Sequence, residues 1–176
     1  MPPTARQIGL RMAADGILWP APAIDARDFA APGATAYRIG RREVRSCVLL
    51  VRDGPSTGTR WATIYARPAY AGYRSVFDEV FPGARMGRDV DHLHPRSVAP
   101  RGDYVALGVI SEASNRSFAD AADANAFAQK VRDMPLSRQH GFASHLTAME
   151  RGWAYVTHFV RPLGDVRAAL TEVEAA

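Results

Sequence analysis

The chain has 176 residues, of which 47% are apolar, and it carries a formal net charge of +4. That is enough apolar material to bury one core, so we expect one compact domain over 1–176. Within it we distinguish a basic N-terminal scaffold (1–84), a central unit (85–134) and a C-terminal helical and apolar extension (135–176). The single cysteine, Cys47, excludes an internal disulfide and a zinc site built on several cysteines.

Neither a signal peptide nor a membrane span is recognisable in the sequence. The N-terminus leads into no apolar segment, and no stretch approaches membrane-spanning length. We therefore expect a cytoplasmic protein with no membrane contact. Delivery into another cell by a route without a classical signal peptide stays open.

Positive charge is concentrated between residues 38 and 74. This segment holds only Glu43 and Asp53 as acids, against eight arginines: Arg38, Arg41, Arg42, Arg45, Arg52, Arg60, Arg67 and Arg74. Such a field suits a polyanion such as nucleic acid. A solvated arginine-rich surface explains the same composition equally well, since Lys130 is the only lysine.

The first elements in chain order are a helix and a β-hairpin. Helical spacing begins at Thr4, a candidate N-cap, and runs to about Ala14, after which the proline-containing stretch 19–36 is expected to be irregular. Two β-type runs, Val44–Arg52 and Trp61–Arg67, flank a polar turn that contains Gly and Pro.

In the second of these runs the aromatic side chains alternate with small and aliphatic ones. Trp61 and Tyr65 would share one face with Thr63. Aromatics beside arginines can stack on nucleic-acid bases, but more often they pack a sheet face.

The rest of the chain predicts one further strand and mostly helices. Tyr70–Phe81 has helical spacing and ends at Pro82 and Gly83, whereas Tyr104–Ile110 has β composition. The remaining predicted helices are 117–134, 137–152 and 165–174, and 153–160 is apolar and ambiguous. The order of elements favours an α+β protein.

The most specific pattern lies in two short stretches. Val90-Asp91-His92-Leu93-His94-Pro95-Arg96-Ser97 places an acid and a histidine next to each other, and Ser114-Asn115-Arg116-Ser117 precedes a predicted helix. The acid and the amide offer hard oxygen ligands for Mg²⁺ or Mn²⁺, and the histidine can accept a proton from water. Because neighbouring strand residues point to opposite faces, Asp91 and His92 need a bend near Pro95 to act on one phosphate.

These residues resemble the HNH (ββα-metal) endonuclease motif, most of all the zinc-free version in the HNH domain of RNA-guided CRISPR effector nucleases. The resemblance covers about residues 88–118. It implies a strand-loop-strand-helix core around 88–130, with Asp91 and Asn115 as ligands of Mg²⁺ or Mn²⁺, no zinc, and His92 as the general base. The fold expected is therefore α+β, with this ββα-metal core, an N-terminal β-hairpin and C-terminal helices.

The sequence departs from the family at one position and leaves several roles open. The family's middle asparagine is missing, and Asp103 either braces the loop in its place or is only a turn residue. The candidate phosphate contacts are Arg96 and Arg116. His94 is a metal ligand, a phosphate contact or a surface histidine. Two further residues have an open alternative each: Asn115 can also cap a helix, and Asp89 is either an added ligand or a polar residue at the strand entry.

The function expected from the resemblance is metal-dependent cleavage of nucleic acid, DNA rather than RNA. Settings that fit are a mobile-element nuclease or a bacterial toxin effector, the latter with a neutralising immunity protein as its partner. The alternative is a catalytically inactive HNH-like module that binds nucleic acid or a partner protein through its basic first half.

Overall fold

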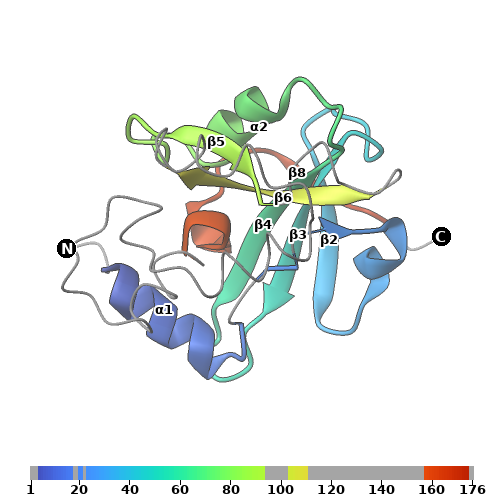
Figure 1. The fold of residues 1–176 in the computed structure, drawn as a ribbon. Coiled ribbons are helices and arrows are strands. Elements are labelled where there is room, and N and C mark those ends of the chain that lie inside the picture. The colour runs from blue at the N-terminus through green and yellow to red at the C-terminus, as the bar shows by residue number, and fades with distance from the viewer. Residues whose placement is uncertain (1–3, 18–19, 22, 94–102, 111–156, 175–176) are drawn as a thin grey trace.

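The computed structural model describes residues 4–17, 20–21, 23–93, 103–110 and 157–174. These residues form a mixed α+β structure, mostly an antiparallel sheet with few helices (Figure 1). The strands are β1 (Ala23–Ile24), β2 (Ala34–Ile39), β3 (Cys47–Asp53), β4 (Arg60–Ala66), β5 (Asp89–His92), β6 (Tyr104–Ile110), β7 (Arg161–Pro162) and β8 (Leu170–Glu172). The helices are α1 (Ala5–Ala14), α2 (Tyr73–Val80) and the 3-10 helices η1 (Ala26–Ala30) and η2 (Leu163–Asp165).

The main path of the sheet runs in the order β1-β6-β4-β3-β2-β8, while β5 pairs with β6 and β7 pairs with β4. All of these pairings are antiparallel. Strand β6 pairs along one edge with β1 at its start and with β5 towards its end. The pairing of β5 with β6 builds the hairpin that carries the Asp-His pair.

Helix α1 forms where the sequence predicts it, and a capping box explains its start. The Thr4 hydroxyl accepts a hydrogen bond from the backbone N–H of Gln7, and the Gln7 side chain accepts one from the backbone N–H of Thr4. The helix closes at Asp15, followed by Gly16 at a φ of +73°.

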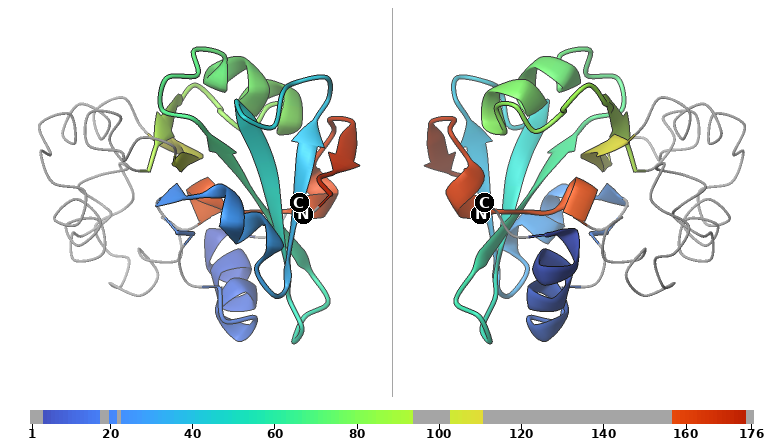
Figure 2. Two further views of the ribbon diagram at one scale, coloured as in Figure 1. Left: turned by 90° about the vertical axis from the view of Figure 1, so that its right-hand side faces the viewer. Right: turned by 90° about the vertical axis from the view of Figure 1, so that its left-hand side faces the viewer.

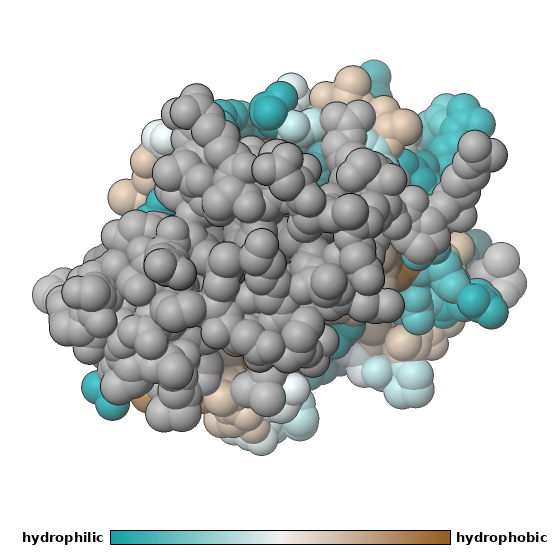
Figure 3. Space-filling view, in the orientation of Figure 1, coloured by the Kyte–Doolittle hydropathy of each residue, from teal (hydrophilic) through white to brown (hydrophobic). Residues whose placement is uncertain are grey.

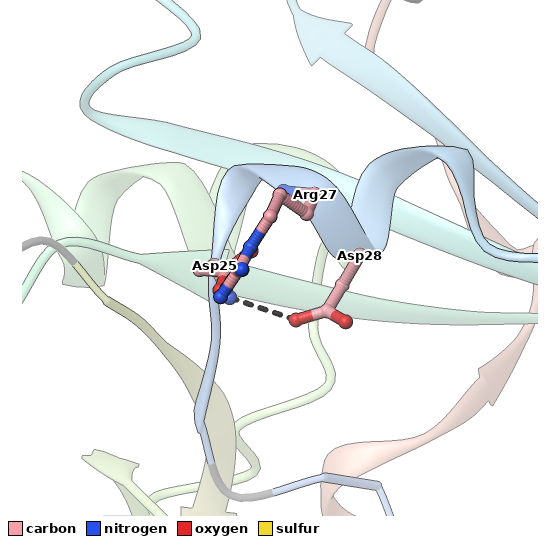
Figure 4. A network of polar contacts seen from close by, with 3 residues as sticks. All are labelled: Asp25, Arg27 and Asp28. Carbon is pink, nitrogen blue, oxygen red and sulfur yellow. Dashed lines mark hydrogen bonds and ion pairs between the residues drawn. The ribbon is translucent and has the colours of Figure 1, made fainter.

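The stretch 19–36 is irregular only in part, because it contains β1, η1 and the beginning of β2. A compact polar network begins η1 (Figure 4). Asp28 accepts a hydrogen bond of 2.8 Å from the backbone N–H of Asp25, and Asp25 accepts one of 2.7 Å from the backbone N–H of Arg27. These two carboxylates satisfy N–H groups that the short helix leaves unpaired.

The predicted β-hairpin is confirmed as β3 and β4, which pair from Cys47 with Ala66 to Asp53 with Arg60. The turn between β3 and β4 begins at Gly54, where the C-terminal end of α1 comes so close that only glycine fits. A Cβ on Gly54 would lie 2.1 Å from Oδ2 of Asp15 and 2.5 Å from the carbonyl oxygen of Thr59. Only glycine leaves room for that carboxylate.

The sheet carries a core on each face. One cluster joins Met12 of α1 to Trp61 and Tyr65 of β4, and the other joins α2 to Ala62 and Ile64. The views in Figure 1 and Figure 2 place α1 and α2 on opposite sides of the long strands. The predicted alternation along β4 is confirmed. Its two aromatics are each 1% exposed, so they pack the sheet face and do not present their rings for base stacking.

The predicted helix over 165–174 is wrong. Residues 163–165 form η2, and β8 then pairs with the free edge of β2. Val166, Ala168 and Leu170 all pack against the core beneath α2. Their spacing of two is typical of a strand, and the ladder with β2 outweighs the helical propensity of the segment.

Several sequence predictions lie outside the described residues. These are the helices over 117–134 and 137–152, most of the ambiguous stretch 153–160, and the helix that would complete a ββα-metal core. Residues 157–159 are described and form a helical turn. The β5–β6 hairpin supplies two strands in the order that such a core needs, but the core itself stays a prediction. No helix in the described part of the chain combines the length and apolar character needed to cross a membrane.

Candidate functional site

The candidate site is built on the β5–β6 hairpin. Strand β6 is buried along its whole length, so it forms a fixed support for the shorter β5. The register sets Asp89 opposite Ile110, Asp91 opposite Gly108, and His92 opposite Leu107.

The two acids of β5 share one face of the sheet. Asp89 and Asp91 are both partly exposed, whereas Val90 and His92, which alternate with them, are buried. The face of Asp91 is also the face of Phe159, because a Cβ added to Gly108 would lie only 2.4 Å from the Phe159 ring. An aromatic ring therefore covers the residue directly opposite Asp91.

This environment favours the protonated form of Asp91. The pKa of Asp91 is raised to about 7, chiefly by burial. The His92 backbone N–H and the charge of Arg74 lower it, and the negative charge of Asp89 raises it. A carboxyl group held this way is ionised at neutral pH only in part. A cation placed beside it would favour the ionised form.

His92 lies on the other face, in the core beneath α2. It is 4% exposed, and its ring lies 4.5 Å from the ring of Tyr73, centroid to centroid, at an interplanar angle of 54°. The guanidinium of Arg74 lies 4.8 Å from the centroid of the same Tyr73 ring. The histidine is therefore packed against an aromatic ring in the core rather than placed at the surface.

Strand alternation separates the two residues that the motif brings together in sequence. Within β5, Asp91 points to the face of Phe159 and His92 points to the face of α2. The bend that would bring both to one phosphate is expected near Pro95, which lies outside the described residues. The roles assigned to Asp91 and His92 stay predictions.

The remaining predicted site residues divide into one that is described and several that are not. Asp103 is partly buried just before β6. The pKa of Arg27 in η1 is raised, mainly by its hydrogen bond to Asp25, and the negative charge of Asp103 adds to this effect. Its predicted role in bracing the loop after His92 is untested. The residues outside the described part of the chain are His94, Arg96, Asn115 and Arg116.

The sequence did not predict two residues that lie near the site. Phe159 falls in the stretch whose secondary structure was ambiguous, so only the fold brings it onto Gly108. His158, 5% exposed, has its Nδ1 atom 3.1 Å from Nη1 of Arg88, the residue before β5. The signal for the first contact was a glycine inside an apolar strand, which often marks a close approach by another group.

The basic segment is less available to a polyanion than its composition indicates. Three of its arginines make ion pairs: Arg42 with Glu79, Arg45 with Glu43, and Arg60 with Asp53. Two more, Arg67 and Arg74, lie over tyrosine rings. Hydrophilic residues also gather at the upper and right-hand margins of the face drawn in Figure 3. The three ion pairs therefore offset part of the positive charge of this segment.

The donor set for a metal is incomplete among the described residues. They contain no group of three His, Cys, Asp or Glu side chains placed to hold an ion. Asp89 and Asp91 supply hard carboxylate oxygens on one strand face, which is the chemistry that Mg²⁺ and Mn²⁺ prefer. The pair fits a divalent cation as part of a site whose other predicted ligand, Asn115, is not described.

The chain matches no protein-family model, and searches of curated proteins and of solved structures gave no match either.

Proposed function

We propose that the protein is a metal-dependent phosphodiesterase that cleaves DNA, with Asp91 as a ligand of Mg²⁺ or Mn²⁺. The observation that carries this proposal is the setting of Asp91 on the β5–β6 hairpin. Burial raises its pKa to about 7 with a second carboxylate, Asp89, on the same face. Carboxyl groups with raised pKa values cluster at functional sites, and a divalent cation bound beside this pair would favour its ionised form.

The proposal gives a role to each of three residues. Asp91, with Asn115, holds the cation and thereby positions the scissile phosphate. When bound, the ion stabilises the charge that develops on the phosphate and on the departing oxygen. His92 takes the proton of the attacking water, which requires its imidazole to leave its place against Tyr73 and reach the face of Asp91.

Cleavage of supercoiled plasmid tests the proposal. We expect the wild-type protein to nick plasmid with Mg²⁺ or Mn²⁺ and to be inactive in EDTA, and we expect His92→Ala to lose cleavage while its DNA affinity stays within about twofold. Tyr73→Leu is the matched control for packing, because it removes the ring that His92 contacts and keeps the imidazole. A folded wild-type protein that nicks with neither metal would refute the proposal.

A second candidate is a module that binds DNA without cleaving it. The burial of His92 against Tyr73, on the face away from Asp91, favours this alternative. Under it, neutralising Arg38 or Arg41 would weaken DNA binding and reduce its salt dependence, whereas His92→Ala would act only through stability. An interaction with DNA that does not respond to salt would contradict it.

A further inference from the structure

A second concave region lies away from the β5–β6 site, between the end of α2 and the C-terminal segment. It is a pocket of about 280 Å³, walled by residues 81–84 on one side and by Arg161, Asp165 and Arg167 on the other. Pockets for drug-sized molecules begin at about 300 Å³. This one therefore suits a small ion with its water, or a single group of a larger molecule.

Arg161 lines this pocket and has a buried nitrogen without a hydrogen bond in the described part of the chain. Its Nε is buried and has no hydrogen-bond partner in the described part of the chain, and its guanidinium lies 5.7 Å from the centroid of the Phe81 ring. Burial lowers the pKa of Arg161 and so does Arg88, whereas Asp165 raises it. A guanidinium in such a place stays charged, so it favours an anion as its partner.

Arg167 is held on the wall of the same pocket by its own segment. Its backbone N–H donates to the carbonyl oxygen of Val80 at 3.0 Å, which ties the segment to the last turn of α2. Its Nη1 donates to the carbonyl oxygens of Gly164 and Val166 at 2.6 and 3.2 Å. The guanidinium is thereby oriented before any ligand arrives, which reduces the entropy lost on binding.

The local charge balance is positive. Nearby, Nη1 of Arg88 lies 3.1 Å from Nδ1 of His158. Arg85 is already paired with Asp78 at 3.0 Å. Among the residues that line the pocket, Arg161 and Arg167 are set against Asp165, which leaves two positive charges and one negative charge.

We propose that the pocket between residues 81–84 and 161–167 binds an oxyanion of the phosphate class, held by the guanidinium groups of Arg161 and Arg167. The proposal is independent of the nuclease activity, because the pocket contains none of the residues assigned to cleavage. Two planar guanidinium groups that line one small pocket offer donors that match the oxygens of a tetrahedral phosphate. The phosphate can be a free ion, part of a small phosphorylated molecule, or one unit of a nucleic-acid backbone.

Calorimetric titration with inorganic phosphate at low ionic strength tests the proposal. We expect saturable binding that weakens about tenfold or more in Arg161→Met, which keeps the apolar stem and removes the donors. Arg167→Gln should weaken binding as well and, being at the exposed wall, serves as the deciding variant if Arg161→Met does not fold. Arg27→Gln is the control, because Arg27 is 91% exposed and pairs with Asp25 in η1.

Either of two results would overturn the proposal: no saturable binding of phosphate to the wild-type protein, or equal binding by all three variants. A short DNA duplex then separates the sources of the phosphate. If Arg161→Met weakens phosphate and DNA binding together, the pocket takes a backbone phosphate. If only phosphate binding weakens, the ligand is a free or small-molecule phosphate. Cleavage by His92→Ala is measured separately, so failure of the phosphate-binding proposal can be told apart from failure of the nuclease proposal.

Discussion

Replacing Gly108 by alanine places a methyl group where the Phe159 ring already lies. The added Cβ would be 2.4, 2.6 and 2.7 Å from three ring carbons, and the ring is 2% exposed, so it has little room to move. Ordinary contacts begin near 3.4 Å, so the ring or strand β6 has to shift by about 1 Å.

The size of the effect follows from two opposing contributions. Overpacking a closed core costs about 1–3 kcal/mol, whereas Gly→Ala at a backbone that alanine can adopt gains about 0.4–1 kcal/mol by restricting the unfolded chain. We therefore expect Gly108→Ala to lower the free energy of unfolding by about 1–2 kcal/mol. The ring covers the residue opposite Asp91, so this substitution should also change the pKa of Asp91.

Urea denaturation of Gly108→Ala and of the control Gly164→Ala measures the effect. A Cβ at Gly164 meets nothing within 4 Å, so the control should change stability by no more than about 0.5 kcal/mol. Adding Phe159→Leu should restore part of the stability lost in Gly108→Ala, because the two residues contact each other. Equal midpoints for the two alanine variants would refute the packing of Phe159 on Gly108.

Three further predictions concern titratable groups. Asp15→Asn should destabilise the protein by about 1 kcal/mol at neutral pH, since the carboxylate accepts hydrogen bonds from Ser56, Thr57 and Trp61. Burial alone would raise the pKa of Asp15, but these hydrogen bonds lower it. The stabilisation is therefore lost as the pH falls through the lowered pKa, and urea midpoints of the wild type and Asp15→Asn that still differ in strong acid would contradict this. Burial raises the pKa of Cys47 to about 11, so a thiol reagent at about pH 8 should label it only after unfolding, and rapid labelling of the folded protein would be evidence against a buried thiol. For Asp91, the folded pKa of about 7 lies above the unfolded value of 3.8, so stability should fall as the pH rises from about 4 to about 7. Asp91→Asn should abolish that fall, and a slope unchanged in the variant would refute the assignment.

Local patterns predicted the elements that depend on local chemistry. Helical spacing after the candidate N-cap Thr4 predicted α1, the polar turn between two β-type runs predicted β3 and β4, and the run Tyr104–Ile110 is β6 residue for residue. Helix α2 is shorter than predicted, because it begins at Tyr73 rather than Tyr70. In these places the amphipathic period and the end signals agree.

Elements that depend on a distant partner were missed. Strand β8 exists because β2 leaves an edge that accepts its backbone hydrogen bonds, and nothing within 165–174 indicates that edge. The contact of Phe159 with Gly108 likewise joins segments some fifty residues apart in sequence. For the candidate site, the motif assigns roles to Asp91 and His92 that stay predictions, whereas the faces on which these residues lie depend on the register of β5 on β6.

Binding of Mn²⁺ measured by calorimetry at about pH 8, where Asp91 is mostly ionised, tests the central claim most directly. The account predicts that the wild-type protein binds the ion and that Asp91→Asn weakens binding by tenfold or more. Asp78 lies on α2 and its carboxylate pairs with Arg85, so Asp78→Asn should bind the ion as the wild type does. Equal titration curves for Asp91→Asn and the wild type would contradict the account, because Asp91 would then hold no metal.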